Sequence, residues 1–506
     1  MIAVFRLSAT AVLLACSVLH AGENWPALHG DNTRSGWYES FPALPLKLAW
    51  HQDLSAELTG PRAEIIVAQG LTFIGSYAGK VRAWDAATGE ERWTHSCGGP
   101  VGHSPAWSEG RLFIASMGGL HCLEAATGKF LWKAEGEAGF WTAPAVAGGL
   151  VMAGDRAGVF RAWDFEGHEK WTLRTDAPIL TPASVEGDQV VFASEDMKVR
   201  CCRVSDGRVL WTSRQLSGLT LRDYAPCITG GLVFVTSCPV QDFHAVLRAD
   251  EEFLTQRTGF HGKDRRFIPG TAEDVEQEQT AILERLKARP DLQTFFALRL
   301  ADGTEPWTAP ILYTAGCHDP MTPPCVDRET GEVFVILRSA YGVWDGGGEV
   351  CPNTCFGSLD HKTGRVRLVA HGYESKDPAR PPGAPDIPWG SFNYIGDETQ
   401  ALSCASGSLF SNHQGFTGRL DRRTGLISRI WGERDTYAGF YGPRTWGYEN
   451  QGGPAKAAAA GKPYALINEW HGPARSIVSV AGGRVYYHSG SQVLCLVPAG
   501  LPKPAR

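Results

Sequence analysis

Nine polar or aromatic residues stand just before short apolar segments of the chain, where strands of a sheet would begin. Their side chains suit a small anionic or sugar-like ligand, because they combine imidazole, guanidinium, carboxylate, amide and indole groups. These candidate ligand-binding residues are His103, Trp141, Arg222, Asp223, His318, Asp319, Asn393, His413 and His471. Trp141 falls outside the regular tryptophan pattern described below, so it is the first aromatic to test for ligand contact. No catalytic role is assigned to any of them.

Recognised catalytic motifs are missing from the sequence. There is no nucleophile motif of the form Gly-x-Ser-x-Gly, no P-loop and no dinucleotide fingerprint. No His-x-His or His-Glu-x-x-His spacing occurs, so we expect no metal. The absence of Cys-x-x-Cys-His predicts that no c-type haem is attached. The formal net charge is −6 and the basic residues form no run, which argues against nucleic-acid binding.

A repeated segment that ends in tryptophan must position these side chains. Trp93, Trp132, Trp171 and Trp211 are 39, 39 and 40 residues apart, and Trp307 closes a further copy. Each copy joins an alternating apolar strand to a Thr-Gly or Asp-Gly turn and then to the tryptophan. A hairpin that begins with glycine precedes each copy. A period near forty with four strands per unit predicts the blades of a β-propeller.

Later copies keep the register but lose the tryptophan. Leu368 and Arg429 occupy its position, and the last repeat lacks an outer strand. We expect the N-terminal segment Leu46–Trp50 to supply that strand and so to close the ring. Closure would remove an open sheet edge. The sequence therefore predicts an all-β, eight-bladed propeller with N-terminal strand closure. The composition, with 59 Gly, 31 Pro and 17 Trp, fits turn-rich β-structure anchored by indoles.

This pattern resembles the PQQ-repeat propellers of the quinoprotein alcohol dehydrogenase-like superfamily. Their tryptophan-docking motif has the form Ala-x-Asp-x-x-Thr-Gly-x-x-x-Trp, and the segment Ala83–Trp93 is the best copy here. The resemblance covers roughly residues 25 to 497. It implies that Trp50, Trp93, Trp132, Trp171, Trp211 and Trp307 are structural and dock between blades. The superfamily includes dehydrogenases that use pyrroloquinoline quinone (PQQ) and cofactor-free BamB-like lipoproteins of outer-membrane assembly.

Several cysteines fall at small interior positions of the repeat. Cys122, Cys201 and Cys495 take the place of Ala83, so we expect them to be packing residues. In quinoprotein dehydrogenases, a vicinal disulfide in a loop packs on the cofactor. The pair Cys201-Cys202 lies instead within an expected strand, where neighbouring side chains point to opposite faces. Two disulfides are predicted elsewhere, between Cys351 and Cys355 across a loop-like spacer and between Cys317 and Cys325.

The ends and insertions complete the domain prediction. Residues 1–21 have the pattern of a signal peptide cleaved near Ala21, although Cys16 offers an alternative lipoprotein anchor. Residues 22–506 form the propeller. An insertion at about 240–292 contains a predicted helix that ends at Arg289-Pro290, and a Pro-rich loop spans about 372–391. We expect the longer insertion to cap one face of the ring. No other stretch is apolar over the roughly 20 residues needed to span a bilayer.

Two classes of function follow. The first is an exported, periplasmic or extracellular propeller without catalysis or cofactor, which binds a protein, peptide or glycan through its faces and takes part in cell-envelope processes. The second is an alcohol or sugar dehydrogenase that depends on PQQ and calcium. The position of Cys201-Cys202, the missing haem motif and the lack of assignable calcium ligands favour the first class.

Overall fold

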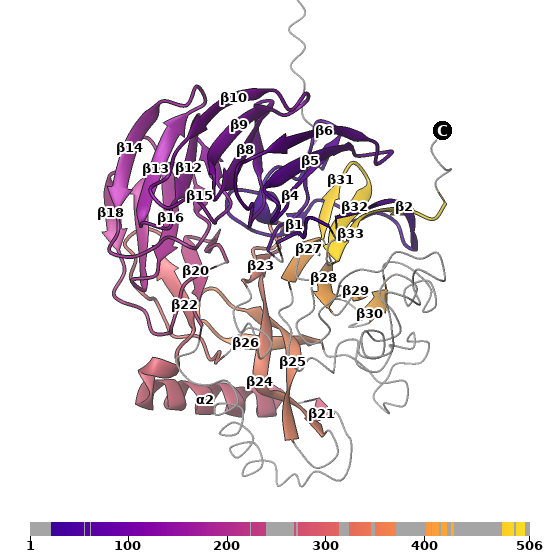
Figure 1. The fold of residues 1–506 in the computed structure, drawn as a ribbon. Helices are drawn as coiled ribbons and strands as arrows, with labels where there is room; N and C mark the ends of the chain where they lie inside the picture. Colours follow the sequence, from indigo (N-terminus) through magenta and orange to yellow (C-terminus); the bar gives the residue numbers. More distant parts are fainter. Residues whose placement is uncertain are drawn as a thin grey trace, which may run out of the picture.

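The computed structural model places eight β-sheets around a ring as the blades of a propeller (Figure 1). The structure describes residues 22–222 without 55 and 61, 224–238, 268–269, 272–312, 323–345, 350–370, 401–405, 407–413, 416–421, 427–429, 478–489 and 492–500. The predicted eight-bladed fold is confirmed. None of the helices within these ranges is long and apolar enough to cross a membrane.

Blades 1 to 4 each contain four antiparallel strands that follow one another from the innermost to the outermost position. Blade 1 comprises β3 (Ile66–Ala68), β4 (Leu71–Gly75), β5 (Lys80–Asp85) and β6 (Glu91–Ser96). Blade 2 comprises β7 (Ala106–Ser108), β8 (Arg111–Ser116), β9 (Gly119–Glu124) and β10 (Phe130–Ala134). Blade 3 comprises β11 (Ala145–Ala147), β12 (Leu150–Gly154), β13 (Val159–Asp164) and β14 (Glu169–Arg174). Blade 4 comprises β15 (Ser184–Glu186), β16 (Gln189–Ser194), β17 (Lys198–Arg203) and β18 (Val209–Thr212).

Blades 5 to 7 continue the same order with additions. Blade 5 contains β19 (Cys227–Thr229), β20 (Leu232–Thr236) and β22 (Phe295–Arg299). Blade 6 contains β23 (Cys325–Val326), β24 (Val333–Asp345), β25 (Val350–Leu359) and β26 (Val366–Ala370), with β21 (Ile268–Pro269) paired to β24. Blade 7 contains β27 (Ala401–Ala405), β28 (Ser408–His413), β29 (Phe416–Asp421) and β30 (Ile427–Arg429). The short strand β1 (Trp37–Tyr38) lies parallel to β27.

Blade 8 joins the two ends of the chain. It contains β31 (Ser479–Ala481), β32 (Arg484–Ser489), β33 (Gln492–Pro498) and, as its outer strand, β2 (Leu46–Asp53). Strand β2 runs antiparallel to β33, with Trp50 opposite Cys495. The predicted closure by an N-terminal strand is therefore confirmed, and in Figure 1 the indigo β2 lies beside the yellow β33.

Each docking tryptophan bridges one blade to the next through its indole N–H. The acceptors are main-chain carbonyls 2.7 to 3.2 Å away: Ala86 for Trp50, Ala125 for Trp93, Phe165 for Trp132, Val204 for Trp171, Leu300 for Trp211 and His361 for Trp307. The indole also covers the glycine of the neighbouring turn. At Gly89, which has φ +75°, a Cβ would lie 2.7 Å from the Trp50 ring. Glycine thus meets both the turn geometry and the close approach.

The burial of these indoles differs from one joint to another. Trp50, Trp171 and Trp211 are buried, whereas Trp93, Trp132 and Trp307 are half-buried on the outermost part of their blades. The residue opposite a docking tryptophan on the neighbouring strand is small wherever that tryptophan itself lies in a strand, for example Ala83 opposite Trp93 and Cys122 opposite Trp132. A larger side chain there would compete with the indole for the same space.

The cysteines on the third strands are buried packing residues. Cys122, Cys201 and Cys495 are each fully buried on β9, β17 and β33. Cys201 and Cys202 are both free and pack into two different core clusters, because successive side chains of β17 point to opposite faces. Cys201 therefore packs in the interface between blades 4 and 5, and Cys202 packs in the interface between blades 3 and 4.

The predicted disulfide between Cys351 and Cys355 is wrong, because both residues lie in β25 and not in a loop. Four residues of extended strand separate their Cα atoms by about 13 Å, whereas a disulfide needs less than about 7 Å. The pairing of Cys317 with Cys325 stays a prediction, since residue 317 lies outside the described residues. The same holds for the signal peptide, for Cys16 and for the loop at 372–391.

The insertion contains the predicted helix, α2 (Ala272–Ala288), followed by the short helix η2 (Pro290–Leu292). The helix lies at the periphery of the ring beside blade 6 (Figure 1). Ile282 and Leu286 are buried in a core cluster that includes Phe234 of blade 5 and Val333 of blade 6. Gln279 accepts a hydrogen bond of 2.7 Å from the main chain of Val366 in β26. We expected this insertion to cap a face, but its described helix covers the edge of a blade.

Candidate functional site

The centre of the ring holds a segment that has no repeat pattern, residues 25–38, hereafter the central segment. It includes the short helix η1 (Leu28–Gly30) and β1. Its main chain and side chains form hydrogen bonds with the innermost strand of blades 1 to 7 and with Val478, next to β31 of blade 8. The partners in chain order are Val67, Trp107, Val146, Val185, Ile228, Val326, Cys404 and Val478. The central segment therefore follows the ring once around, inside the channel.

Arg34 is the best-connected side chain of the central segment. It is fully buried, and its guanidinium donates to the main-chain carbonyls of Leu28, Pro144 and Ala183. Burial, the largest effect, lowers the pKa of this guanidinium to about 10, while Asp31 and Glu64 oppose that shift. The group remains charged at neutral pH. It links the central segment to the loops that lead into blades 3 and 4.

Glu64 and His29 form a buried acid–base contact beside Arg34. One Glu64 carboxylate oxygen accepts a hydrogen bond of 2.7 Å from the main-chain N–H of His29. The other lies 3.4 Å from the Nε2 atom of His29. Burial raises the pKa of Glu64 to about 7 and lowers the pKa of His29 to about 3. Both side chains are therefore predominantly neutral in mildly acidic solution, and Glu64 titrates near neutrality.

Aromatic and cationic side chains meet over one mouth of the channel. The guanidinium of Arg62 lies 4.4 Å above the Tyr224 ring and hydrogen-bonds to its hydroxyl. Arg62 precedes blade 1 and Tyr224 precedes blade 5, so their contact spans the mouth of an eight-bladed ring. Trp141 stacks on Tyr77 with ring centroids 6.0 Å apart. These four residues, Arg62, Tyr77, Trp141 and Tyr224, are called the mouth group below, and all four are half-buried.

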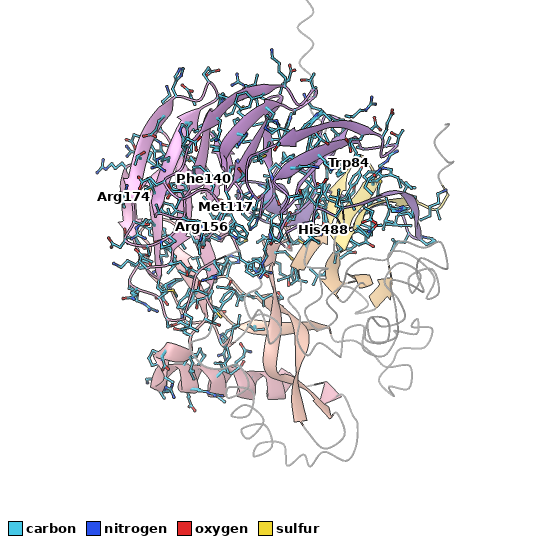
Figure 2. The ribbon with its side chains drawn as sticks, viewed as in Figure 1. Trp84, Met117, Phe140, Arg156, Arg174 and His488 are labelled. Atoms are coloured by element: carbon cyan, nitrogen blue, oxygen red, sulfur yellow. The ribbon has the colours of Figure 1, made fainter. Side chains whose placement is uncertain are left out.

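The same end of the ring carries further loops of blades 2 and 3. Within each blade the strands alternate in direction. The loops between second and third strands therefore lie at the same end of the ring as the loops that lead from one blade into the next. Figure 2 shows Met117, Phe140 and Arg156 close together toward the centre of the ring. The exposed Arg156 lies 3.8 Å from the Met117 sulfur. His488 of blade 8 contacts the Ala63 carbonyl of blade 1 at 2.5 Å.

The structure brings three of the nine predicted ligand-binding residues to this end of the ring. His103 is buried beneath the mouth, close enough to His29 to lower its pKa. Trp141 belongs to the mouth group, and the exposed Arg222 pairs with Glu195 at 3.3 Å. His413 ends β28, and its side chain is not described. The remaining candidates lie outside the described residues: Asp223, His318, Asp319, Asn393 and His471.

Sequence reasoning missed both the central segment and Glu64. The central segment carries no hydrophobic periodicity, and most of its contacts use main-chain atoms, which every residue type provides. One signal was present in the residue types. His29, Asp31 and Arg34 form a dense polar run between Trp25 and Tyr38, with none of the alternation expected of a strand.

A second cluster of side chains lies between blades 1 and 2 and was also missed. One ring nitrogen from each of His95 and His121 and the sulfur of Cys97 all lie within 4.8 Å of one another. The expectation that the protein binds no metal stays a prediction. It rested on short motifs, and those motifs do not detect ligands that come from two different blades.

Eight blades in a ring, with tryptophans at six of the eight joints that cover the glycine turn of the next blade, define a PQQ-repeat β-propeller. Residues 47–119 and 102–334 match the family model described as outer membrane protein assembly factor BamB. Together these matches span more than half of the 506 residues. The chain belongs to this family.

Among the individual relatives, one is named as an outer membrane protein assembly factor and another as a quinohemoprotein alcohol dehydrogenase. Outer membrane protein assembly factor BamB from Nitrosomonas eutropha is 28% identical over 133 residues, which is 26% of this chain and 32% of the relative. Quinohemoprotein alcohol dehydrogenase from Comamonas testosteroni is 30% identical over 219 residues, 37% of this chain and 29% of the relative. The chain thus spans about a third or less of the length of the curated relatives it matches.

The solved structure of the Comamonas testosteroni quinohemoprotein alcohol dehydrogenase shares the fold. It superimposes with a TM-score of 0.54 at 12% identity and covers 96% of this chain and 82% of its own. At such low identity the likeness extends to the fold alone.

Proposed function

We propose that this protein is an exported, non-catalytic propeller that binds a protein partner through the mouth group and the surrounding loops, in the assembly or maintenance of the cell envelope. One observation carries the proposal. The central segment contacts every blade from inside the channel, so the ring centre is occupied by the protein's own chain. Binding is then left to the loops and side chains around the mouth.

The composition of the mouth supports recognition of a protein. Tyrosine, tryptophan and arginine are the residues most enriched at the energetic centres of protein interfaces. The mouth group contains all three types, half-buried and held in two contacting pairs, Trp141 with Tyr77 and Arg62 with Tyr224. Preorganised aromatic side chains lose little conformational entropy when a partner binds. The name of the BamB relative, an assembly factor of outer membrane proteins, agrees with a scaffold of this kind.

The residues described around the channel do not fit a sandwiched PQQ cofactor. A planar quinone needs an uncovered aromatic face, but the Trp141 indole is covered by Tyr77 and by Gly102, where a Cβ would lie 3.0 Å from the ring. The only vicinal cysteine pair, Cys201-Cys202, is buried in the core of blade 4. We therefore propose that neither PQQ nor calcium is required for function.

Site-specific photocrosslinking in cells of the source organism tests the binding proposal. A photoreactive amino acid at position 141 or 222 is expected to give a discrete crosslinked partner. The same substitution at Arg208, an exposed residue in the turn at the opposite end of blade 4, serves as the matched control. Equal crosslinking from position 208, or none from positions 141 and 222, would contradict the proposed surface.

A cofactor assay separates the proposal from the dehydrogenase alternative. Purified protein is titrated with PQQ in the presence of calcium by calorimetry and is assayed for dye reduction with alcohols and sugars. We expect neither binding nor turnover. Micromolar or tighter binding that is lost in a Trp141→Ala or Arg222→Ala variant would assign the protein to the dehydrogenases.

A further inference from the structure

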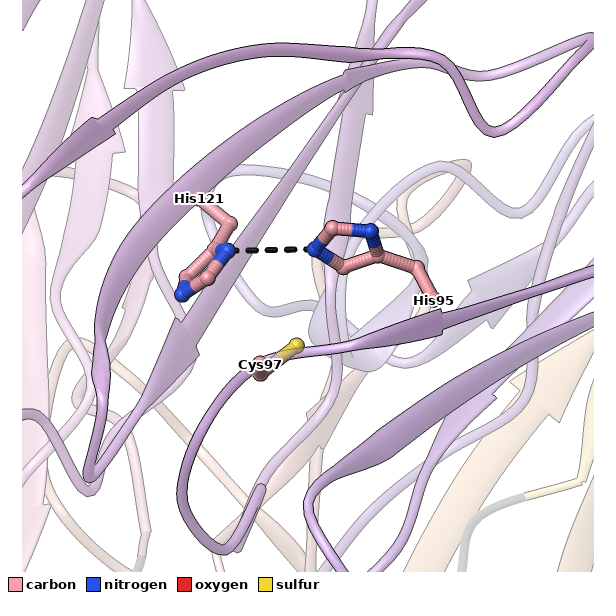
Figure 3. A group of neighbouring side chains, drawn as sticks. All are labelled: His95, Cys97 and His121. Carbon is pink, nitrogen blue, oxygen red and sulfur yellow. Dashed lines mark hydrogen bonds between the residues drawn. The ribbon is translucent and has the colours of Figure 1, made fainter.

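Three side chains with metal-binding atoms face each other across the joint between blades 1 and 2. His95 lies on β6, the outer strand of blade 1, and Cys97 follows that strand directly. His121 lies on β9, the third strand of blade 2. In Figure 3 the Cys97 sulfur points toward the gap between the two imidazole rings. His95 and Cys97 come from blade 1 and His121 from blade 2, yet their three donor atoms lie within 4.8 Å of one another.

The spacing of the two imidazole nitrogens is close to the spacing around a tetrahedral ion. His95 Nε2 and His121 Nδ1 are 3.2 Å apart. Two nitrogens bound to one zinc ion at about 2.0–2.1 Å lie about 3.4 Å apart at a tetrahedral angle. Imidazole and thiolate are the donor types of structural zinc sites. Two imidazoles with one thiolate are also the donor set of blue-copper sites, so the cluster suits a thiophilic transition metal, with water or a fourth group completing the shell.

The surroundings hold the two rings in place. Phe130 stacks on His95 with an interplanar angle of 10°, and it meets the His121 ring edge-on. Cys97 and His121 are buried, whereas His95 is half-buried and leaves a path from solvent. The second nitrogen of His121, Nε2, is buried without a hydrogen bond of normal geometry.

Comparison with the other blades shows that the cluster is not part of the repeat. The position of His121 on the third strand is occupied by Arg82 in blade 1, Arg161 in blade 3 and Arg200 in blade 4. Each of those arginines forms an ion pair with an acidic residue. Blade 2 alone among these four places a histidine there, opposite a histidine and a cysteine of its neighbour.

We propose that His95, Cys97 and His121 form a binding site for a thiophilic divalent transition metal, with zinc as the natural ion. The metal would tie the outer strand of blade 1 to the third strand of blade 2. Its role would be structural, and a fourth position would be open to water. This site is separate from the mouth group. A negative result in the metal titration would therefore leave the proposed partner binding unaffected, and a negative crosslinking result would leave the metal site unaffected.

Cobalt is the probe, because it replaces zinc and reports its ligands in the absorption spectrum. The full-length protein is stripped with a chelator and titrated with Co²⁺. We expect one equivalent to give intense visible bands of tetrahedral cobalt and a sulfur-to-cobalt charge-transfer band in the near ultraviolet. Zinc is expected to displace the cobalt and abolish both. No saturable one-to-one binding would overturn the proposal and leave an ordinary histidine–histidine hydrogen bond beside a buried thiol.

Variants assign the ligands. Cys97→Ser is expected to remove the charge-transfer band, and His121→Ala is expected to remove the visible bands. His95→Gln, at a half-buried position that tolerates change, provides a variant that should fold normally and still lose tight binding. Cys238→Ser and His168→Ala, which alter a cysteine and a histidine outside the cluster, are the matched controls. A charge-transfer band that survives in Cys97→Ser but is lost in Cys238→Ser would refute the assignment.

Discussion

The guanidinium of Arg34 donates hydrogen bonds of 2.9 and 3.1 Å to the carbonyl oxygen of Ala183, a residue 149 positions further along the chain. This contact joins the centre of the ring to the loop that leads into blade 4. It belongs to a set of contacts through which the central segment reaches each blade in turn.

Replacement of Arg34 by alanine is expected to destabilise the whole ring. The buried carbonyls of Ala183, Leu28 and Pro144 would lose a charged donor, at a cost of about 3 kcal/mol or more. Chemical denaturation measures the free energy of unfolding. The control Arg156→Ala removes an exposed arginine and should change stability by about 0.5 kcal/mol or less. Equal effects of the two variants would contradict a structural role for the central segment.

Ring closure gives a second prediction. Trp50→Ala is expected to cost roughly 3–5 kcal/mol, because the buried indole fills the joint between blades 8 and 1. Deletion of residues 44–52 removes all of the outer strand of blade 8 except Asp53 and should lower thermal stability severely. Gly89→Ala tests the same joint from the other side, since the added Cβ would collide with the indole. A loss below about 1 kcal/mol in Trp50→Ala would show that closure contributes little.

Glu64 predicts a particular dependence of stability on pH. Its folded-state pKa of about 7 lies above the ordinary 4.5, so the folded protein holds the proton more tightly. The resulting stabilisation is complete below pH 4.5 and is lost as the pH rises through 7. The stability of the wild type relative to Glu64→Gln should therefore fall by up to roughly 3 kcal/mol between these limits. Denaturation at a series of pH values measures this difference.

His29 supplies the control, because its pKa moves the other way. Its folded-state pKa of about 3 lies below the ordinary 6.5, so its stabilisation is present above 6.5 and is lost as the pH falls through 3. As the pH rises from 3 to 6.5, the free energy of unfolding of the wild type relative to His29→Gln should therefore increase. Differences that stay constant with pH in both variants would contradict the buried acid–base contact.

The vicinal cysteines are expected to stay reduced and unreactive in the folded protein. Burial raises the pKa of both Cys201 and Cys202 to about 12, so almost no thiolate is present at neutral pH. Treatment with iodoacetamide followed by mass spectrometry should show alkylation at these positions only after denaturation. The half-buried Cys238 serves as the comparison. A disulfide between Cys201 and Cys202 would overturn their assignment as packing residues.

Much of the architecture was predictable because the interactions of each blade are local. The tryptophan, the turn glycine and the small residue opposite the indole recur at a fixed spacing, so their roles follow from the repeat itself. Trp50 shows how far this reasoning extends. A single strand that ends in tryptophan, together with a missing strand at the other end of the chain, was enough to predict closure onto β33. Where the repeat weakened, as at Cys351 and Cys355, a strand was mistaken for a loop.

The sequence by itself determined the number of blades, the register of the strands and the burial of Cys201, because these follow from the repeat pattern. Only the tertiary structure decided what lies between repeats. His95 and His121 meet because blade 1 packs on blade 2, and the 25 residues between them follow no ligand motif. Arg34 meets Ala183 because a segment without periodicity lines a closed ring. Contacts between blades depend on where the closed ring places each surface, and a pattern read along one strand does not contain that information.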